Sequence, residues 1–299
     1  MLTPFFLDVL ECVYMVVMRT IFVFLLLLLP TSTFAWEPRF VSEEAVVVLH
    51  PEVAQIFYDT LIGEPRAYRM TSDVVWTLSL SLLAPANKNP NGKFDAIVVN
   101  ESNGTVASVL EAGSTLWEPY YDVVGVEHYA RGPKLEQELP PGAYRIMVTS
   151  SGNIGRYALA IGEKDEFSFN ETIAKITLLP RLKKDFFASS PSTLLGSPLF
   201  LGYGAILLVL GTLIGVYAKK NANNIRFSYM QKSGYRNAKN IDLIGRSVRL
   251  LIGLILFLFA IFTTWNPLLI AAAGFCFYEA AAGWCAVFSV LGRSSCPIE

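Results

Sequence analysis

The sequence has little cysteine, and its cysteines are unevenly placed. The chain of 299 residues contains Cys12, Cys276, Cys285 and Cys296, and none lies between residues 36 and 197. A domain in that stretch must therefore fold without disulfides or thiolate metal sites. Cys276 and Cys285 are nine residues apart, which on a helix places them on opposite faces. We interpret them as small buried apolar side chains.

Charge is also scarce. Charged residues make up 16% of the chain and hydrophobic residues 53%, and the formal net charge is -1. No basic excess points to a nucleic-acid partner. Such an apolar composition is typical of chains with long apolar runs. The runs lie near residues 20–30 and beyond residue 198, whereas residues 36–197 have the composition of a globular domain. We therefore predict a membrane protein with one folded domain outside the bilayer.

Common catalytic motifs are missing as well. The sequence has no His-Glu-x-x-His, no Gly-x-Ser-x-Gly and no Cys–His pair. Its only histidines, His50 and His128, stand near Glu52 and Glu127, and a shared metal site is an alternative reading of them. We predict no enzymatic activity, no metal and no cofactor.

The N-terminus reads as a secretory signal peptide over residues 1–35. Arg19 precedes an apolar stretch at 21–29, and Thr33-Phe34-Ala35 supplies the small-residue cleavage site. We predict Met18 as the true start, since residues 1–17 fit no part of a signal peptide. An uncleaved anchor is the alternative. Either reading places residue 36 onward outside the membrane.

Residues 36–165 alternate strand-like runs with turn signals and show no helical period. The clearest piece is 140–161, where Tyr144, Ile146 and Val148 share one face, followed by Tyr157, Leu159 and Ile161 on another. This pattern predicts a hairpin with one buried face. For the whole stretch we predict an antiparallel, jelly-roll-like β-sandwich.

The two strands of that hairpin have the sequences Pro-Gly-Ala-Tyr-Arg-Ile-Met-Val and Gly-Arg-Tyr-Ala-Leu-Ala-Ile-Gly. These sequences resemble the last strands of bacterial pre-peptidase C-terminal domains. The resemblance covers about 25 residues. It implies an accessory β-sandwich concerned with binding.

An aromatic-rich stretch in this domain is a candidate binding surface for a glycan or an envelope protein. Packing in the core is the alternative for some of the rings. The stretch contains Trp117, Tyr120, Tyr121 and Tyr129. Asn100, Asn103 and Asn170 each begin an Asn-x-Ser/Thr sequon, which makes them glycosylation candidates in a host that glycosylates.

Residues 166–197 are predicted to form a juxtamembrane helical connector, capped by Asn170 and broken or kinked at Pro180. Lys183 and Lys184 stand beside Phe186 and Phe187. This basic and aromatic cluster is interpreted either as lying on lipid headgroups or as a solvated connector.

The C-terminal third predicts three transmembrane helices, at residues 199–217, 247–264 and 268–291. Trp265-Asn266-Pro267 forms the turn that joins the last two. Small residues permit close helix packing, and the candidates are Gly204, Gly211, Gly215 and Gly283.

The loop at 218–246 sets the predicted orientation. It holds one acid, Asp242, against seven basic residues: Lys219, Lys220, Arg226, Lys232, Arg236, Lys239 and Arg246. Basic loops stay in the cytoplasm. We therefore expect a protein of the cytoplasmic (inner) membrane, with the large domain extracytoplasmic and the tail at 292–299 cytoplasmic.

Residues 239–297 resemble the small two-helix YgaP-like inner-membrane domain. The matching text is Asn240-Ile241-Asp242, then Arg246, Arg249 and Gly253, then Gly283-Trp284-Cys285 and Leu291-Gly292. Ala286 stands where the family commonly has proline. The resemblance implies a membrane fold and a tendency to form homodimers, but no reaction.

Three polar residues in or beside the predicted spans are functional candidates. Glu279 falls near the middle of the third span, where a carboxylate costs about 2.5–3.5 kcal/mol on insertion scales. We expect no basic residue at its depth, and a proton or a hydroxyl such as that of Thr212 or Tyr203 as its partner. Arg246 and Arg249 share a helix face and are candidates for lipid-headgroup binding or topological anchoring.

Two functions follow from these features. The first is a membrane-anchored envelope protein whose β-sandwich is a binding module. The second is a membrane transport or sensing component centred on Glu279.

Overall fold

The computed structural model describes residues 37–41, 45–87, 92–113, 116–164, 169–222 and 239–291. The predicted signal peptide, most of the basic loop and the C-terminal tail lie outside the described residues. The chain divides into two compact units, with the boundary between Ser197 and Pro198. We call residues 37–197 the outer unit and residues 198–291 the helical unit, and describe each by itself.

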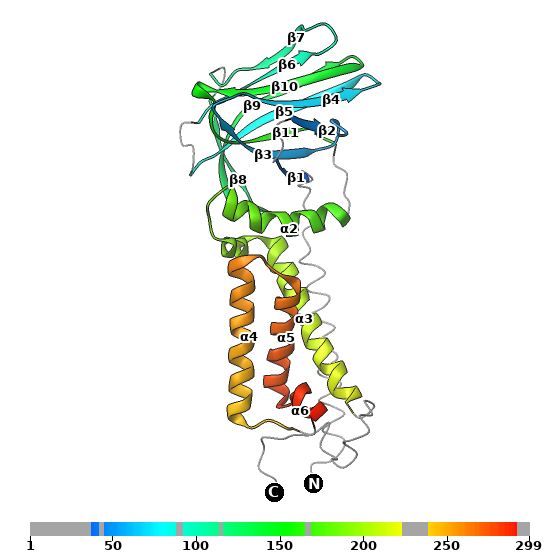
Figure 1. Cartoon of the computed structure of the whole chain (residues 1–299), viewed down its shortest axis with the longest axis vertical. Coiled ribbons are helices and arrows are strands. Elements are labelled where there is room, and N and C mark those ends of the chain that lie inside the picture. The colour runs from blue at the N-terminus through cyan, green and yellow to red at the C-terminus, as the bar shows by residue number, and fades with distance from the viewer. Residues whose placement is uncertain are drawn as a thin grey trace. The chain divides into compact units, whose positions relative to one another are not determined.

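The outer unit is built on two β-sheets (Figure 1). Sheet A has the strand order β1-β3-β11-β5-β9-β8, and sheet B has the order β2-β4-β10-β6-β7. The strands of sheet A are β1 (Glu37–Phe40), β3 (Gln55–Ile62), β11 (Ile154–Ile161), β5 (Trp76–Pro85), β9 (Glu127–Leu139) and β8 (Glu118–Asp122). Those of sheet B are β2 (Ala45–Val48), β4 (Arg66–Ser72), β10 (Gly142–Ser150), β6 (Phe94–Asn100) and β7 (Val106–Leu110).

The sheets are mixed, which corrects the prediction of a wholly antiparallel sandwich. β1 pairs with β3 in parallel, and β2 pairs with β4 in parallel. Between β1 and β3 the chain passes through β2 of the other sheet, and such a long connection permits parallel pairing. Side-chain alternation marks a strand and its buried face, but it carries no information on the direction of the neighbouring strand.

The predicted hairpin at 140–161 is wrong in its pairing. β10 pairs with β4 and β6 in sheet B, whereas β11 pairs with β3 and β5 in sheet A. The short 3-10 turn η1 (Ser151–Asn153) carries the chain from one sheet to the other. The predicted buried faces are confirmed, since their six members are at most 1% exposed: Tyr144, Ile146, Val148, Tyr157, Leu159 and Ile161. Buried and exposed side chains alternate along two strands in the same way whether the strands pair in one sheet or face each other across a core. Alternation therefore did not reveal the pairing.

A polar cluster inside the sandwich links the two sheets. The Asp59 carboxylate on β3 accepts hydrogen bonds from the hydroxyls of Tyr68 on β4, at 3.0 Å, and Tyr157 on β11, at 3.3 Å. Arg66 Nε lies 2.8 Å from the same carboxylate. Because every group has a partner, the buried charge is compensated and contributes to fixing one sheet against the other.

Helix α2 (Phe169–Asp185) belongs to the outer unit and lies close to β1 (Figure 1). Pro180 lies inside the helix and does not end it. Lys183, Phe186 and Phe187 are buried. The rings of Phe186 and Phe187 pack edge-on against Tyr58 of sheet A, with centroids 5.3 and 6.1 Å away. These three side chains therefore neither meet lipid nor face solvent, and both predicted readings of the cluster are wrong for them.

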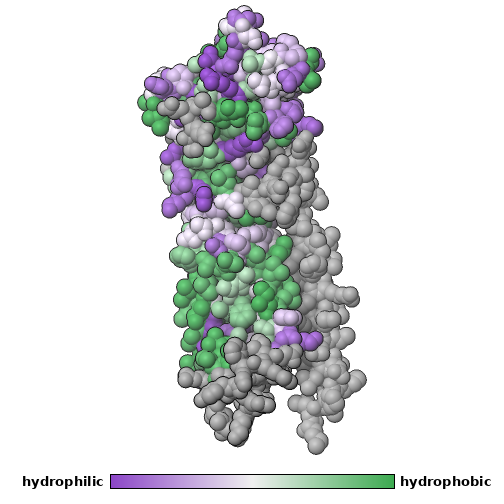
Figure 2. All heavy atoms as spheres, turned by 45° about the vertical axis from the view of Figure 1, so that its right-hand side comes forward, coloured by the Kyte–Doolittle hydropathy of each residue, from purple (hydrophilic) through white to green (hydrophobic). Residues whose placement is uncertain are grey.

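The helical unit contains α3 (Pro198–Asn221), α4 (Leu243–Thr263), α5 (Pro267–Ala282) and α6 (Ala286–Leu291). A short 3-10 segment, η2 (Pro191–Gly196), precedes it in the chain. By length and composition α3 and α4 are able to cross a membrane, whereas α5 has 16 residues. Hydrophobic side chains cover most of the described surface of this unit in the view of Figure 2.

The predicted third span at 268–291 is not one helix. α5 ends at Gly283, whose φ of 62° is left-handed, and α6 begins at Ala286. Glycine takes that conformation without a Cβ clash and often ends helices in this way. Apolar composition alone did not indicate the break.

Candidate functional site

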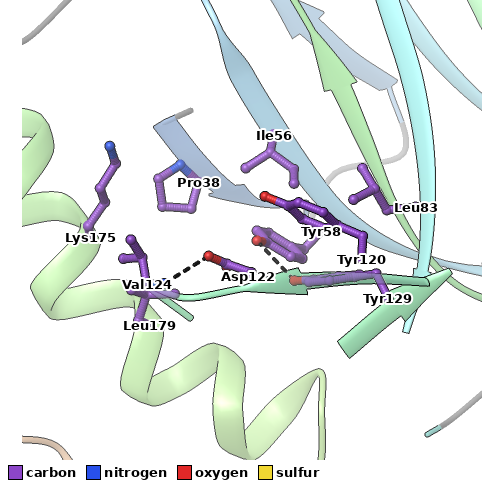
Figure 3. Close-up of a pocket in the computed structure, with 10 residues that line it drawn as sticks. All are labelled: Pro38, Ile56, Tyr58, Leu83, Tyr120, Asp122, Val124, Tyr129, Lys175 and Leu179. Carbon is purple, nitrogen blue, oxygen red and sulfur yellow. Dashed lines mark hydrogen bonds between the residues drawn. The ribbon is translucent and has the colours of Figure 1, made fainter. Parts of the chain in front are cut away.

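A pocket on the outer face of sheet A is the candidate site of the outer unit (Figure 3). Its volume is about 60 Å³. Sheet A supplies most of the wall and α2 the rest, with Val124 from the turn after β8. The lining residues are Pro38, Ile56, Tyr58, Leu83, Tyr120, Asp122, Val124, Tyr129, Lys175 and Leu179. An apolar wall thus surrounds a few polar groups, the usual make-up of a binding site.

The polar groups of the pocket lie together in Figure 3. The Tyr129 hydroxyl donates to the Tyr58 hydroxyl at 3.4 Å, and Asp122 Oδ1 accepts from the backbone N–H of Val124 at 2.9 Å. Burial raises the pKa of Asp122 above its ordinary value of 3.8, although backbone N–H groups of Gly125 and Val124 work against the shift. Burial also raises the pKa of Tyr58 and of Tyr129, so both phenols are neutral donors at physiological pH.

A buried ion pair holds the end of α2 beside this pocket. Lys183 Nζ lies 2.5 Å from Glu127 Oε1 and also donates to the Val126 carbonyl at 2.8 Å. Ser189 Oγ donates to the same glutamate oxygen at 3.0 Å. Burial lowers the pKa of Lys183, and the hydrogen bond to Glu127 opposes that shift.

The predicted aromatic candidates separate into three environments. Tyr120 and Tyr129 line the pocket. Trp117 packs against the sandwich core and donates from Nε1 to the Ala112 carbonyl at 3.0 Å. Tyr121 is 42% exposed and lies 4.7 Å from the ring of His128. Only part of the predicted aromatic surface is therefore available to a ligand.

The three sequon asparagines and His50 are not among the residues that line the pocket. Asn100 and Asn103 stand at the exposed turn after β6, and Asn103 Oδ1 accepts from the Thr105 hydroxyl at 2.7 Å. Asn170 lies in the first turn of α2. His50 lies 3.6 Å from Glu52. Within the described ranges, no group of three His, Cys, Asp or Glu side chains is placed to hold a metal ion.

Glu279 lies in the last turn of α5, not at the middle of a continuous span. Its Oε1 accepts from the backbone N–H of Ala286 at 2.6 Å, and its Oε2 lies 4.0 Å from Arg249 Nε on α4. The expectation that no basic residue shares its depth is therefore wrong. The expected hydroxyl partners bond elsewhere, since Thr212 donates to the Leu208 carbonyl and Tyr203 to the Trp265 carbonyl.

Arg246 and Arg249 contact protein groups. Arg246 donates to the carbonyls of Ala280 and Ala281, at 2.7 and 3.1 Å, at the C-terminal end of α5. Arg249 Nη2 lies 3.2 Å from Cys285 Sγ. Their contact with lipid headgroups stays a prediction.

The side chain of Asn240 forms hydrogen bonds to the backbone at the break between α5 and α6. Asn240 accepts from the N–H of Cys285 at 2.7 Å and donates to its carbonyl at 2.9 Å. The backbone N–H of Asn240 also donates to the Gly283 carbonyl at 3.1 Å. The end of α5 and the start of α6 are therefore both bonded to the segment that precedes α4.

The predicted packing glycines lie where helices meet. A Cβ on Gly211 of α3 would lie 1.9 Å from the Ala271 carbonyl oxygen of α5, and one on Gly215 would lie 2.4 Å from the Tyr278 ring. Gly204 faces Trp265 at 3.5 Å. Gly283 instead ends a helix. Sequence reasoning missed Gly274, whose Cβ would lie 2.3 Å from the Leu208 carbonyl oxygen.

The C-terminal part of the chain matches one family model. Residues 237–299 match the model of the transmembrane domain of YgaP-like inner membrane proteins, which confirms the predicted resemblance. No curated protein matches the chain by sequence.

The solved structures that are similar to this chain include the following two. One is the pre-peptidase C-terminal domain of collagenase from Bacillus anthracis, with 14% identity and a TM-score of 0.25, over 43% of this chain and 97% of that one. The other is a β-glucosidase from Paenibacillus barengoltzii, with 9% identity and a TM-score of 0.21, over 44% of this chain and 14% of that one. The pre-peptidase resemblance predicted from the last strands thus recurs in the structural comparison, and no functional inference rests on similarities at this level.

Proposed function

We propose that this chain is a membrane-anchored envelope protein whose outer β-sandwich is a binding module. The pocket between sheet A and α2 is its binding site. One observation carries the proposal: three tyrosines and a poorly solvated carboxyl group line an open hollow of the outer unit. Natural interiors leave few such hollows unfilled.

The orientation is part of the proposal. Lys219 and Lys220 end α3, and Arg246 and Arg249 lie near the start of α4. Basic residues therefore flank the connection between these helices at both ends, which supports a cytoplasmic location for it. The outer unit then lies on the extracytoplasmic side. α5 is about 24 Å long at 1.5 Å per residue. With the residues after Gly283 it completes a third crossing, which leaves the C-terminus in the cytoplasm.

An envelope protein or a glycan-bearing molecule is the proposed partner class, and the helices remain candidates for homodimer contacts. Transport through Glu279 has less support. Its carboxylate already accepts from Ala286 and lies near Arg249. A role in joining α5, α6 and α4 explains these contacts.

Site-specific photo-crosslinking in cells tests the binding role. A photoreactive benzoyl-phenylalanine replaces Lys175, a half-exposed residue of α2 that lines the pocket. The matched control replaces Ile154, which is 72% exposed and lies on β11. We expect a discrete adduct from position 175 and none from position 154. No adduct, or the same adducts at both positions, would contradict the proposal.

A further inference from the structure

The walls of the pocket combine aromatic rings with one carboxyl group. Tyr58, Tyr120 and Tyr129 line it together with Asp122 (Figure 3). Aromatic faces attract cations through the ring quadrupole, and the attraction grows as the site loses water. A carboxylate that burial has partly stripped of water also gains from a bound positive charge. Both features favour the same kind of ligand.

The backbone around Asp122 is shaped to keep the carboxyl group in place. Its Oδ1 accepts from Val124, and a Cβ on Gly125 would lie 2.5 Å from its Oδ2. The backbone N–H groups of Val124 and Gly125 are its two donors, and an ionised carboxylate has further acceptor positions. The raised pKa of Asp122 agrees with a carboxylate short of solvent or positive partners.

The cations near the pocket have different positions. Lys183 is paired with Glu127 at 2.5 Å. The Arg131 guanidinium carbon lies 3.7 Å from the centre of the Tyr120 ring, where it stacks on that ring. Lys175 lines the pocket from α2. A cation entering the pocket is therefore repelled by these basic side chains, and substitution of Lys175 lowers that repulsion.

Size limits the ligand further. A volume of about 60 Å³ suits a small head group of a few heavy atoms. The aliphatic part of the wall, with Pro38, Ile56 and Leu179, suits methyl or methylene groups next to a charged nitrogen.

We infer that the pocket binds the ammonium group of a small organic cation, either methylated or at the end of an alkyl chain. The inference rests on the proposed binding role of the same pocket. The charged nitrogen lies among the tyrosine rings with Asp122 as its counter-ion, and the alkyl groups contact the aliphatic wall.

Calorimetric titration of the full chain in a maltoside detergent tests the inference. The probes are choline, n-butylammonium and 3,3-dimethylbutan-1-ol, the uncharged carbon isostere of choline. We expect at least one of the two cations to bind, and the isostere to bind at least about tenfold more weakly than choline if choline is the ligand, a difference of about 1.4 kcal/mol. Choline alone indicates a methylated head group and n-butylammonium alone a primary amine.

Three variants sharpen the result. Asp122→Asn keeps an acceptor for Val124 but removes the charge, and we expect it to weaken cation binding at least about tenfold. Lys175→Gln lowers the repulsion, so we expect tighter binding. Glu138→Gln, an exposed residue of β9 outside the pocket lining, is the matched control and should leave affinity unchanged.

Two outcomes overturn the cation assignment. One is failure of both cations to bind. The other is equal binding of choline and its isostere that Asp122→Asn does not alter. Neither outcome contradicts the broader binding role of the pocket, which the crosslink at position 175 tests separately.

Discussion

Asp122 and Lys183 are ionisable side chains on the outer face of sheet A, where Asp122 is half-buried and Lys183 is buried. Burial shifts the pKa of Asp122 upward and that of Lys183 downward, so in both cases loss of water outweighs nearby opposite charge. Lys183 has a close partner in Glu127, whereas Asp122 receives only backbone donors and more distant charges. The two residues therefore predict different mutational behaviour.

Replacing Asp122 by Asn should change how stability depends on pH. A raised pKa means that the folded state binds more protons than the unfolded state between 3.8 and the folded pKa, so ionisation of Asp122 lowers stability as pH rises through that window. We expect the stability of the wild type relative to Asp122→Asn to fall across the window and to stay constant above it. Urea unfolding followed by the β-sheet circular-dichroism signal measures this. If the stability of the wild type relative to Asp122→Asn instead rose with pH, the pKa of Asp122 would not be raised in the folded state.

The Lys183–Glu127 pair should show strong coupling. Lys183→Met leaves the Glu127 carboxylate buried without its counter-ion, and we expect a loss of about 3–5 kcal/mol in unfolding free energy. The double variant Lys183→Met/Glu127→Gln removes both charges and should recover much of that loss. A double-mutant cycle on the same unfolding transition gives the coupling energy. Additive effects would show that the pair is not coupled.

At the residue scale, the sequence predicted local features and missed distant partners. The buried set around Tyr144 and Tyr157 followed from alternation alone. Lys183 was misread because its partner lies 56 positions earlier in the chain, and nothing near Lys183 indicates Glu127. Glu279 was recognised as unusual, but its contact with Arg249 depends on how α5 ends.

At the scale of elements, glycines set the distance between α3 and α5. Gly211 of α3 and Gly274 of α5 each face a backbone carbonyl of the other helix closely enough to exclude a Cβ. A backbone carbonyl cannot move aside as a flexible side chain does. The crossing point of the two helices is therefore intolerant of any larger residue.

We expect Gly211→Ala to destabilise the helical unit by about 1–3 kcal/mol through overpacking. Gly202→Ala is the control on the same helix, since a Cβ there meets nothing within 4 Å. Unfolding in sodium dodecyl sulfate, followed by the helical circular-dichroism signal, compares the two variants with the wild type. Equal behaviour of Gly211→Ala and Gly202→Ala would show that the helices do not pack as described.

Individual helices and strands were predicted better than the pairings between them. The two strands within 140–161 and the apolar stretches of α3 and α4 followed from composition and period. The parallel edge strands, the sheet change between β10 and β11 and the break at Gly283 did not, because each depends on which chain segment comes alongside. The pocket could not be predicted from the sequence for the same reason, since five strands, a turn and a helix contribute residues to it.

At the scale of the whole molecule, the division into two units follows from where the apolar residues lie. An outer unit with its own core and a helical unit of mostly exposed apolar helices have opposite solvent requirements. A bilayer satisfies the second, and the match of residues 237–299 to an inner-membrane domain family agrees with it. The central claim is that the two units serve as anchor and extracytoplasmic binding module.

Thiol labelling in intact spheroplasts tests that claim most directly. Leu116→Cys places a thiol at a position of the outer unit that is 89% exposed, and Lys220→Cys places one at the end of α3. The wild type, with its own four cysteines, sets the background. The account predicts that a membrane-impermeant maleimide labels Leu116→Cys in intact spheroplasts and Lys220→Cys only after lysis. Labelling of Lys220→Cys in intact spheroplasts, with Leu116→Cys protected until lysis, would contradict it.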